Sequence, residues 1–240
     1  MELTPLLFST AAALGNLAGA AVVVRAARRG LAAIQVLLAF GAGFMLALVL
    51  AGVLPLVFQR SGDAGLTGVL VLTGYLLVHV TQHALTPHFH FGEERHPVPR
   101  SAGYAALVGL VLHAFFDGVA VASGFLVSRA LGLLFFLAIL LHKLPEGVSV
   151  ASVMLASGLG ARRAMQAGLV LALTTIAGAL LTGAVESLAR YGLALASGVT
   201  LYVAASNLVP EVQATRGFRI TLAFLGGVAA LLLLRQVGSG

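Results

Sequence analysis

Eight apolar segments, each long enough to cross a lipid bilayer, follow one another along this chain of 240 residues. A helix needs about 20 predominantly apolar residues to cross the hydrocarbon core. We predict the spans at 4–24, 33–58, 64–86, 103–127, 131–157, 164–186, 191–213 and 219–237. Only 9% of the residues are charged, whereas a soluble domain has about 25%. The sequence therefore predicts an all-α polytopic membrane protein with eight transmembrane helices.

The connections between these segments are short, except for the polar stretch 87–100. We therefore expect residues 1–240 to form a single membrane domain, with the lipid bilayer as its main partner. The absence of cysteine excludes disulfides and thiolate metal sites. The arginines lie singly or in small groups between apolar segments, so the basic pI indicates membrane topology and not binding to nucleic acid. The first basic residue, Arg25, follows the first apolar segment, so we expect that segment to remain as a span.

The distribution of arginines predicts the orientation. Nine of them lie in the connections after spans 1, 3, 5 and 7, and four lie on the opposite side, at Arg60, Arg129, Arg190 and Arg235. Because positive residues accumulate on the cytoplasmic side, both termini are expected outside. The histidine-bearing loop 87–100 is expected in the cytoplasm, and the chain in the cell (inner or plasma) membrane.

Two matched motifs interrupt the fourth and fifth spans. His113 and Asp117 are four residues apart, as are His142 and Glu146, so each pair projects from one helix face. The second motif repeats the first at an offset of 29 residues, and each carboxylate is followed by glycine. A turn near 128–129 makes the two spans antiparallel, so both pairs reach similar depth and can form one site.

Ionisable groups at membrane depth are costly and are retained mainly for function. The two imidazoles and two carboxylates would supply nitrogen and oxygen ligands suited to Zn²⁺, Fe²⁺ or Mn²⁺. Pro145 lacks an N–H group, so it is expected to kink the fifth span and to free the Leu141 carbonyl beside the ligands. Gly118 and Gly147 should let neighbouring helices approach closely.

These residues resemble the ZIP (Zrt/Irt-like) family of divalent metal transporters, and the chain is similar to its bacterial or archaeal members. The motifs HAFFDG and HKLPEG stand in the fourth and fifth of eight spans, as in that family. The resemblance implies an eight-helix bundle that transports Zn²⁺, or Fe²⁺, Mn²⁺ or Cd²⁺, into the cytoplasm. It implies a metal site at His113, Asp117, His142 and Glu146, no enzymatic activity, no cofactor other than the transported ion, and a homodimer.

The departures from the family pattern indicate a single metal. Ala114 stands where the family often has Asn, and Lys143 stands where some members with two metals have Asp. Leu56 replaces an acidic residue, and Ser206-Asn207 replace His-Glu. We therefore expect the Lys143 ammonium to lie near the place of a second cation.

Other polar residues could line a path for the ion. His79 and His83 are four residues apart near the cytoplasmic end of the third span, and His88 and His90 follow in the loop. Histidine-rich tracts commonly bind metals, so these residues are candidates for an exit. On the seventh span, Asn207 and Glu211 are also candidates for the path.

Two other functions remain open at this point. An intramembrane metal-dependent hydrolase could use the same ligands to activate water, although the chain has no HExxH motif. A proton-linked transporter or channel for another substrate could use the carboxylates as a relay. Hydrolytic activity would distinguish the first alternative, and metal-free transport unaffected by His142→Ala would distinguish the second.

Overall fold

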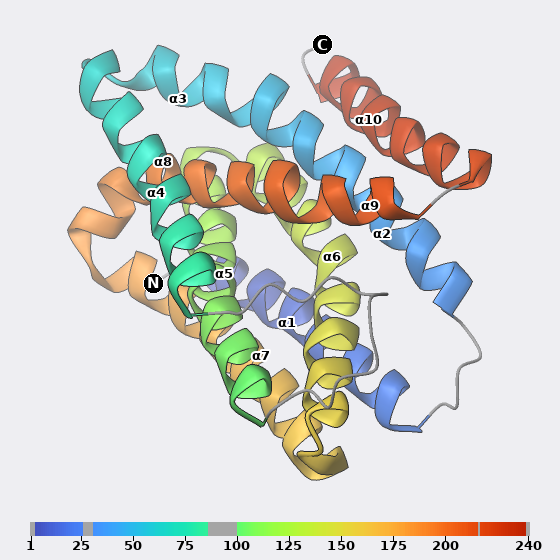
Figure 1. Ribbon diagram of the computed structural model, residues 1–240. Helices are drawn as coiled ribbons and strands as arrows, with labels where there is room; N and C mark the ends of the chain where they lie inside the picture. The colour runs from blue at the N-terminus through green and yellow to red at the C-terminus, as the bar shows by residue number, and fades with distance from the viewer. Residues whose placement is uncertain (1–2, 26–30, 86–99, 216, 239–240) are drawn as a thin grey trace.

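The computed structural model describes residues 3–25, 31–85, 100–215 and 217–238, and all of its regular structure is helical (Figure 1). The helices are α1 (Leu3–Arg25), α2 (Leu31–Ala47), α3 (Leu54–Arg60), α4 (Ala64–Leu85), α5 (Arg100–Val127), α6 (Arg129–Ala156), α7 (Gly160–Ala184), α8 (Glu186–Tyr202), α9 (Val209–Ala214) and α10 (Phe218–Gly238), and the π-helical turns are η1 (Leu48–Val53) and η2 (Val203–Leu208).

Within the described residues, eight segments are long and apolar enough to cross a membrane. The second combines α2, η1 and α3, and the seventh combines α8, η2 and α9. The predicted all-α fold with eight spans is confirmed. The largest difference between a predicted and an observed boundary is at the seventh span, which begins at Glu186 and not at 191. The fourth and fifth spans, which carry the two motifs, are α5 and α6.

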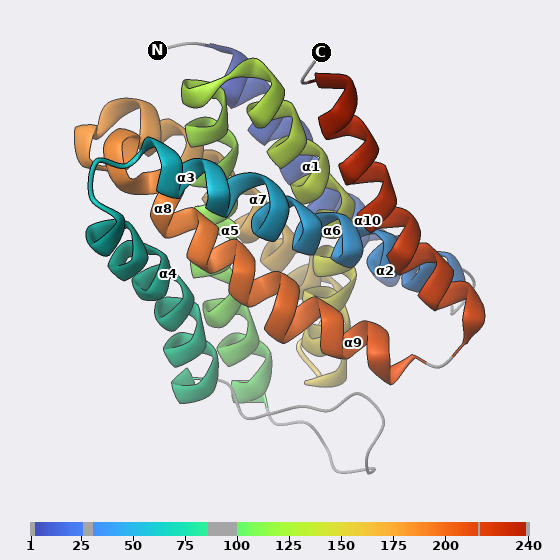
Figure 2. The same ribbon diagram turned by 90° about the horizontal axis from the view of Figure 1, so that it is seen from above.

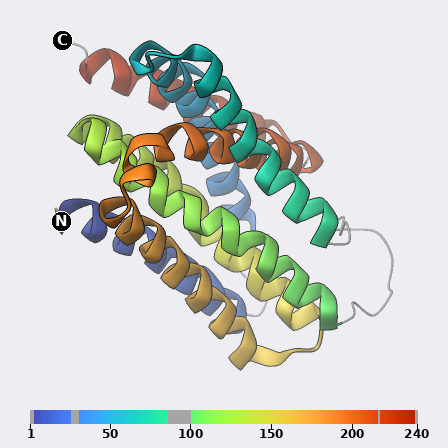
Figure 3. The same cartoon turned by 90° about the vertical axis from the view of Figure 1, so that its left-hand side faces the viewer.

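The helix ends alternate between two ends of the bundle. The start of α1 and the end of α10 lie at the same end, and the end of α4 and the start of α5 lie at the other (Figures 2 and 3). Helices α1, α5, α6 and α7 pack against one another, while α2 pairs with α10 and α4 pairs with α8. The α1/α5/α6/α7 group is joined to the rest through α8, which packs on α5, and α2, which packs on α6.

Glycines at the helix crossings allow this close packing. A side chain at Gly118 would clash with the backbone oxygen of Thr175 on α7, and one at Gly147 would clash with the backbone oxygen of Asn16 on α1. The predicted close approach at both motif glycines is therefore confirmed. Because small residues let membrane helices touch through their backbones, the carboxylates beside these glycines lie deep inside the four-helix group.

The two π-helical turns were not predicted from the sequence, and each lies directly before a Leu-Pro or Val-Pro pair. The Leu54 N–H donates to Val49 O, five residues earlier, and Pro55 follows. Pro55 has no N–H to donate to the preceding turn, and within this turn the carbonyl of Ala51 accepts a hydrogen bond from the guanidinium of Arg235 on α10. A neighbouring helix thus supplies a hydrogen-bond donor to the backbone beside this proline, as is common for prolines inside membrane helices.

A one-residue connection joins the two helices that carry the motifs. Helix α5 ends at Val127 and α6 begins at Arg129, with Ser128 between them as the N-cap. The hydroxyl of Ser128 accepts a hydrogen bond from the N–H of Leu131 at 3.1 Å, which satisfies a free donor of the first turn. The predicted turn is therefore confirmed, and α5 and α6 run back along each other.

Candidate metal site

Four buried side chains converge between α5 and α6. His113 and Asp117 come from α5, and His142 and Glu146 come from α6. Each offers one potential ligand atom, and these atoms all lie within 4.8 Å of one another. The structure therefore brings the two motifs into one cluster, and all four residues are at most 8% exposed.

The carboxylate of Asp117 lies at the centre of this cluster. Its Oδ2 lies 3.3 Å from Nε2 of His113 and 3.3 Å from Nε2 of His142. Nδ1 of His142 lies 2.9 Å from the carbonyl oxygen of Ala138, an acceptor that assigns the proton of the neutral ring to Nδ1. Nε2 of His142 then carries a lone pair that points at a carboxylate, an arrangement that a cation between them would stabilise.

Lys143 places an ammonium group in the same cluster. Its Nζ lies 2.7 Å from Oδ2 of Asp117 and 2.6 Å from Oε2 of Glu146, and the residue is 0% exposed. The ammonium therefore bridges the two carboxylates. With neutral imidazoles, the two carboxylates and this ammonium leave the cluster with one net negative charge.

Glu146 keeps one oxygen free for a ligand. Its Oε2 is bound by Lys143, but its buried Oε1 has no hydrogen-bond partner in the described part of the chain. This oxygen lies 4.0 Å from Nε2 of His113. A buried carboxylate oxygen without a partner is costly, and a cation bound between these two atoms would remove that cost.

Asn16, on α1, was missed by the sequence analysis. The residue is completely buried, and its amide nitrogen, in the orientation that satisfies its neighbours, lies 2.6 Å from Lys143 O and 3.2 Å from Oε2 of Glu146. A single asparagine in an apolar segment has no spacing pattern to reveal its role. The signal that could have found it is the rarity of polar residues at membrane depth and their tendency to bond across helices.

The Leu141 carbonyl, which Pro145 was expected to free, lies beside α2. Leu141 is packed against Gly41 of α2, where a Cβ would lie 3.5 Å from the Leu141 oxygen. Its addition to the four side chains stays a prediction. The helix α6 is continuous through Pro145 from Arg129 to Ala156.

The predicted exit and path residues do not join the four-residue cluster where the structure describes them. The ring of His79 is stacked on Tyr75 and packs edge-on against Tyr202, with centroids 6.4 and 5.8 Å apart. The hydroxyl of Tyr75 is 3.0 Å from that of Ser206.

On the seventh span, Asn207 lies in η2 and Glu211 is an exposed residue of α9. The side chain of His83 and all of His88 and His90 lie outside what the structure describes. Their role in a path stays a prediction.

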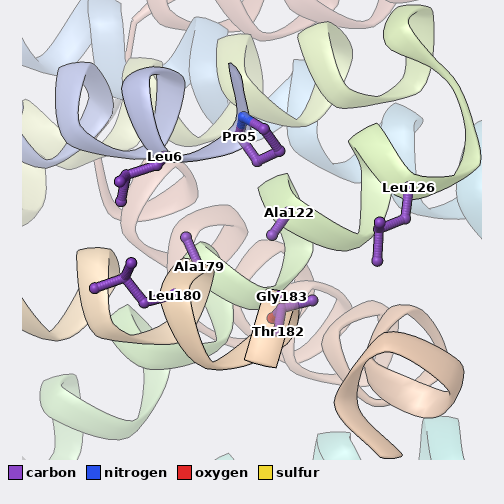
Figure 4. A pocket seen from close by; sticks show the side chains of 8 residues that line it. All are labelled: Pro5, Leu6, Ala122, Leu126, Ala179, Leu180, Thr182 and Gly183. Atoms are coloured by element: carbon purple, nitrogen blue, oxygen red, sulfur yellow. The ribbon is translucent and has the colours of Figure 1, made fainter. Parts of the chain in front are cut away.

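A separate pocket opens between α1, α5 and α7 (Figure 4). Its lining is almost entirely apolar, with Pro5, Leu6, Ala122, Leu126, Ala179, Leu180, Thr182 and Gly183. The hydroxyl of Thr182 already donates to the carbonyl of Gly178 at 2.8 Å. The pocket therefore offers no set of metal ligands, unlike the four-residue cluster between α5 and α6.

Curated proteins similar to this chain are named as zinc transporters. "Zinc transporter ZIP4" of Homo sapiens is 36% identical over 148 residues, which are 58% of this chain and 23% of that protein. "Zinc transporter SLC39A7" of Mus musculus is 34% identical over 153 residues, which are 58% of this chain and 32% of that protein. The match thus leaves more than two thirds of the length of each relative uncovered.

The family model described as "ZIP Zinc transporter" matches residues 99–235. This range contains both motifs, all four side chains of the cluster and Lys143, and it covers more than half of the chain. The chain belongs to the ZIP zinc transporter family.

Proposed function

We propose that this protein transports a divalent metal cation, Zn²⁺ in particular, across the membrane into the cytoplasm. The observation that carries the proposal is the buried cluster of two imidazoles and two carboxylates in a chain with eight apolar helices. The names of its curated relatives support zinc as the substrate. On this proposal the protein is a transporter and not an enzyme, and the metal is cargo.

The four side chains act as ligands of one transported ion. Nε2 of His142 and Oε1 of Glu146 are available for a cation, and Asp117 faces both imidazoles. One divalent ion would change the net charge of the cluster from one negative to one positive. A second would add two more positive charges in a medium of low dielectric constant, which is strongly unfavourable. The Lys143 ammonium therefore opposes the binding of a second ion.

The proposed direction rests on the arginine distribution and on the family resemblance. The chain lies in the inner or plasma membrane of the cell. Both termini lie outside, and the loop 87–100 lies in the cytoplasm. The ion enters from the outer side, rests at the cluster and leaves near His79, His83, His88 and His90, with Asn207 and Glu211 along the path. The chain forms a single domain of the bacterial or archaeal type, and two chains assemble as a homodimer.

Zinc uptake by proteoliposomes tests this function. We expect the wild-type protein to load vesicles with Zn²⁺, and both His142→Ala and Glu146→Gln to reduce uptake to the level of empty vesicles, because the first removes a ligand atom and the second removes the charge of a ligand. Glu186→Gln is the matched control, since Glu186 is exposed at the start of α8. Its uptake should equal that of the wild type.

Competition among Zn²⁺, Fe²⁺, Mn²⁺ and Cd²⁺ in the same assay ranks the substrates. Normal uptake by both His142→Ala and Glu146→Gln would show that the cluster is not the transport site. Transport of another substrate without metal would favour a proton-linked carrier. Hydrolysis by the zinc-loaded protein without uptake would favour a hydrolase.

A further inference from the structure

Helix α1 contributes a polar side chain to a site whose charged groups all come from α5 and α6. Asn16 is 0% exposed, as is Lys143, and it lies at the crossing of α1 and α6. Its backbone oxygen is in contact with Gly147, directly after Glu146, and Gly19 on the next turn of α1 abuts the backbone oxygen of Leu144. The backbones are in contact at this crossing, which places the side chain of Asn16 beside Glu146.

In the amide orientation that satisfies its neighbours, the nitrogen of Asn16 faces two acceptors on α6. It lies 2.6 Å from the carbonyl oxygen of Lys143 and 3.2 Å from Oε2 of Glu146. An amide NH₂ group has two hydrogens, so it can donate to both. Oε2 of Glu146 is then held by two donors, Asn16 and the ammonium of Lys143, which lies 2.6 Å away.

The two oxygens of Glu146 therefore have different surroundings. Oε2 is held by donors, whereas Oε1 has no partner among the described residues and lies 4.0 Å from Nε2 of His113. We propose that Asn16 is a positioning residue that holds Oε2 of Glu146, so that Oε1 is presented to the metal ion. This inference rests on the proposed function, because it assigns Glu146 as a ligand.

A neutral donor is suited to this task in a way that Lys143 is not. The ammonium carries a positive charge, so an arriving divalent cation repels it and competes for the same carboxylates. The amide of Asn16 carries no net charge, and its bond to Oε2 is compatible with a metal on Oε1. Asn16 therefore keeps Glu146 oriented both in the empty and in the loaded site. Groups that orient a ligand in this way typically contribute about 10- to 100-fold to metal affinity.

The test measures zinc binding by the purified full chain in competition with a chelating dye. Asn16→Leu keeps the size of the side chain but removes the donor, and we expect it to weaken zinc binding about 10- to 100-fold. Asn16→Ala places no added atoms in the tight crossing and should have the same effect if Asn16→Leu does not fold. Ser9→Ala is the matched control, because Ser9 is a buried polar residue of the same helix with no partner among the described residues. It should bind zinc like the wild type.

A second measurement separates positioning from simple helix docking. Saturating Co²⁺ in place of Zn²⁺ gives visible absorption bands that depend on ligand geometry. We expect these bands to change in Asn16→Leu and Asn16→Ala and to remain unchanged in Ser9→Ala. If the Asn16 variants lower only the melting temperature, with wild-type zinc affinity and cobalt spectrum, the positioning role is overturned.

The same measurements on Glu146→Gln distinguish this inference from the proposed function. If Glu146→Gln loses zinc binding while the Asn16 variants keep it, the ligand assignment stands and the role of Asn16 is overturned. If Glu146→Gln binds zinc like the wild type, the ligand assignment itself fails. Weaker zinc binding and an altered cobalt spectrum in the Asn16 variants support the proposal.

Discussion

The substitution Asp117→Asn is expected to weaken zinc binding more than a hundredfold. Oδ2 of Asp117 lies 3.3 Å from both imidazole nitrogens and 2.7 Å from the ammonium of Lys143. Removing its charge leaves the cluster with no net negative charge, so a divalent ion would add two uncompensated charges in a buried place. Loss of one partner from a buried charged pair costs about 3 kcal/mol or more, and about 1.4 kcal/mol corresponds to tenfold in affinity.

The measurement is a zinc titration of purified Asp117→Asn beside the wild type, in competition with a chelating dye. The asparagine keeps the shape of aspartate, so the helices should remain packed and the melting temperature serves as a check of the fold. Asp63→Asn is the control, because Asp63 is exposed before α4 and its Oδ1 accepts the local N–H of Leu66 at 2.9 Å. Equal zinc affinity in Asp117→Asn and the wild type would exclude Asp117 as a ligand.

The substitution Lys143→Asp should raise the number of tightly bound zinc ions from one to two per chain. In the wild type, the ammonium of Lys143 lies 2.7 Å from Asp117 and 2.6 Å from Glu146 and neutralises one of the two carboxylates. Aspartate at this position would give the cluster three negative charges, so two divalent ions would leave one net positive charge, as one ion does in the wild type. It would also add a carboxylate ligand of the kind that divalent ions bind.

Metal content after equilibrium dialysis against Zn²⁺ measures this number directly. Lys143→Met is the matched control, because it removes the ammonium without adding a ligand. We expect Lys143→Met to hold one ion. Two tightly held ions in the wild type, or a single ion in Lys143→Asp, would contradict the role of Lys143 as the substitute for a second cation.

The regular spacing of the sequence made the spans and the convergence of the two motifs predictable. His113 and Asp117 share one helix face, His142 and Glu146 share another, and the 29-residue offset across a turn places both pairs at one depth. These features depend on helix geometry alone. The eight spans depend only on length and hydropathy, so they could also be read from the chain.

Contacts between distant segments could not be read in this way. Asn16 lies in the first span and Glu146 in the fifth, and the crossing of α1 and α6 brings the two together. Because Lys143 directly follows His142, the sequence placed it near the site. The bridge from its Nζ to both carboxylates depends on its side-chain conformation. The π-helical turns depend on how the neighbouring helices satisfy backbone groups near proline, as Arg235 does for Ala51.

Anomalous diffraction at the zinc absorption edge, from crystals of the wild-type protein equilibrated with Zn²⁺, tests the central claim most directly. We predict one strong peak between α5 and α6, at about 2.0–2.2 Å from nitrogen or oxygen atoms of His113, Asp117, His142 and Glu146. A strong peak elsewhere, with no peak among these four side chains in protein that takes up zinc, would contradict the assignment of the cluster as the metal site.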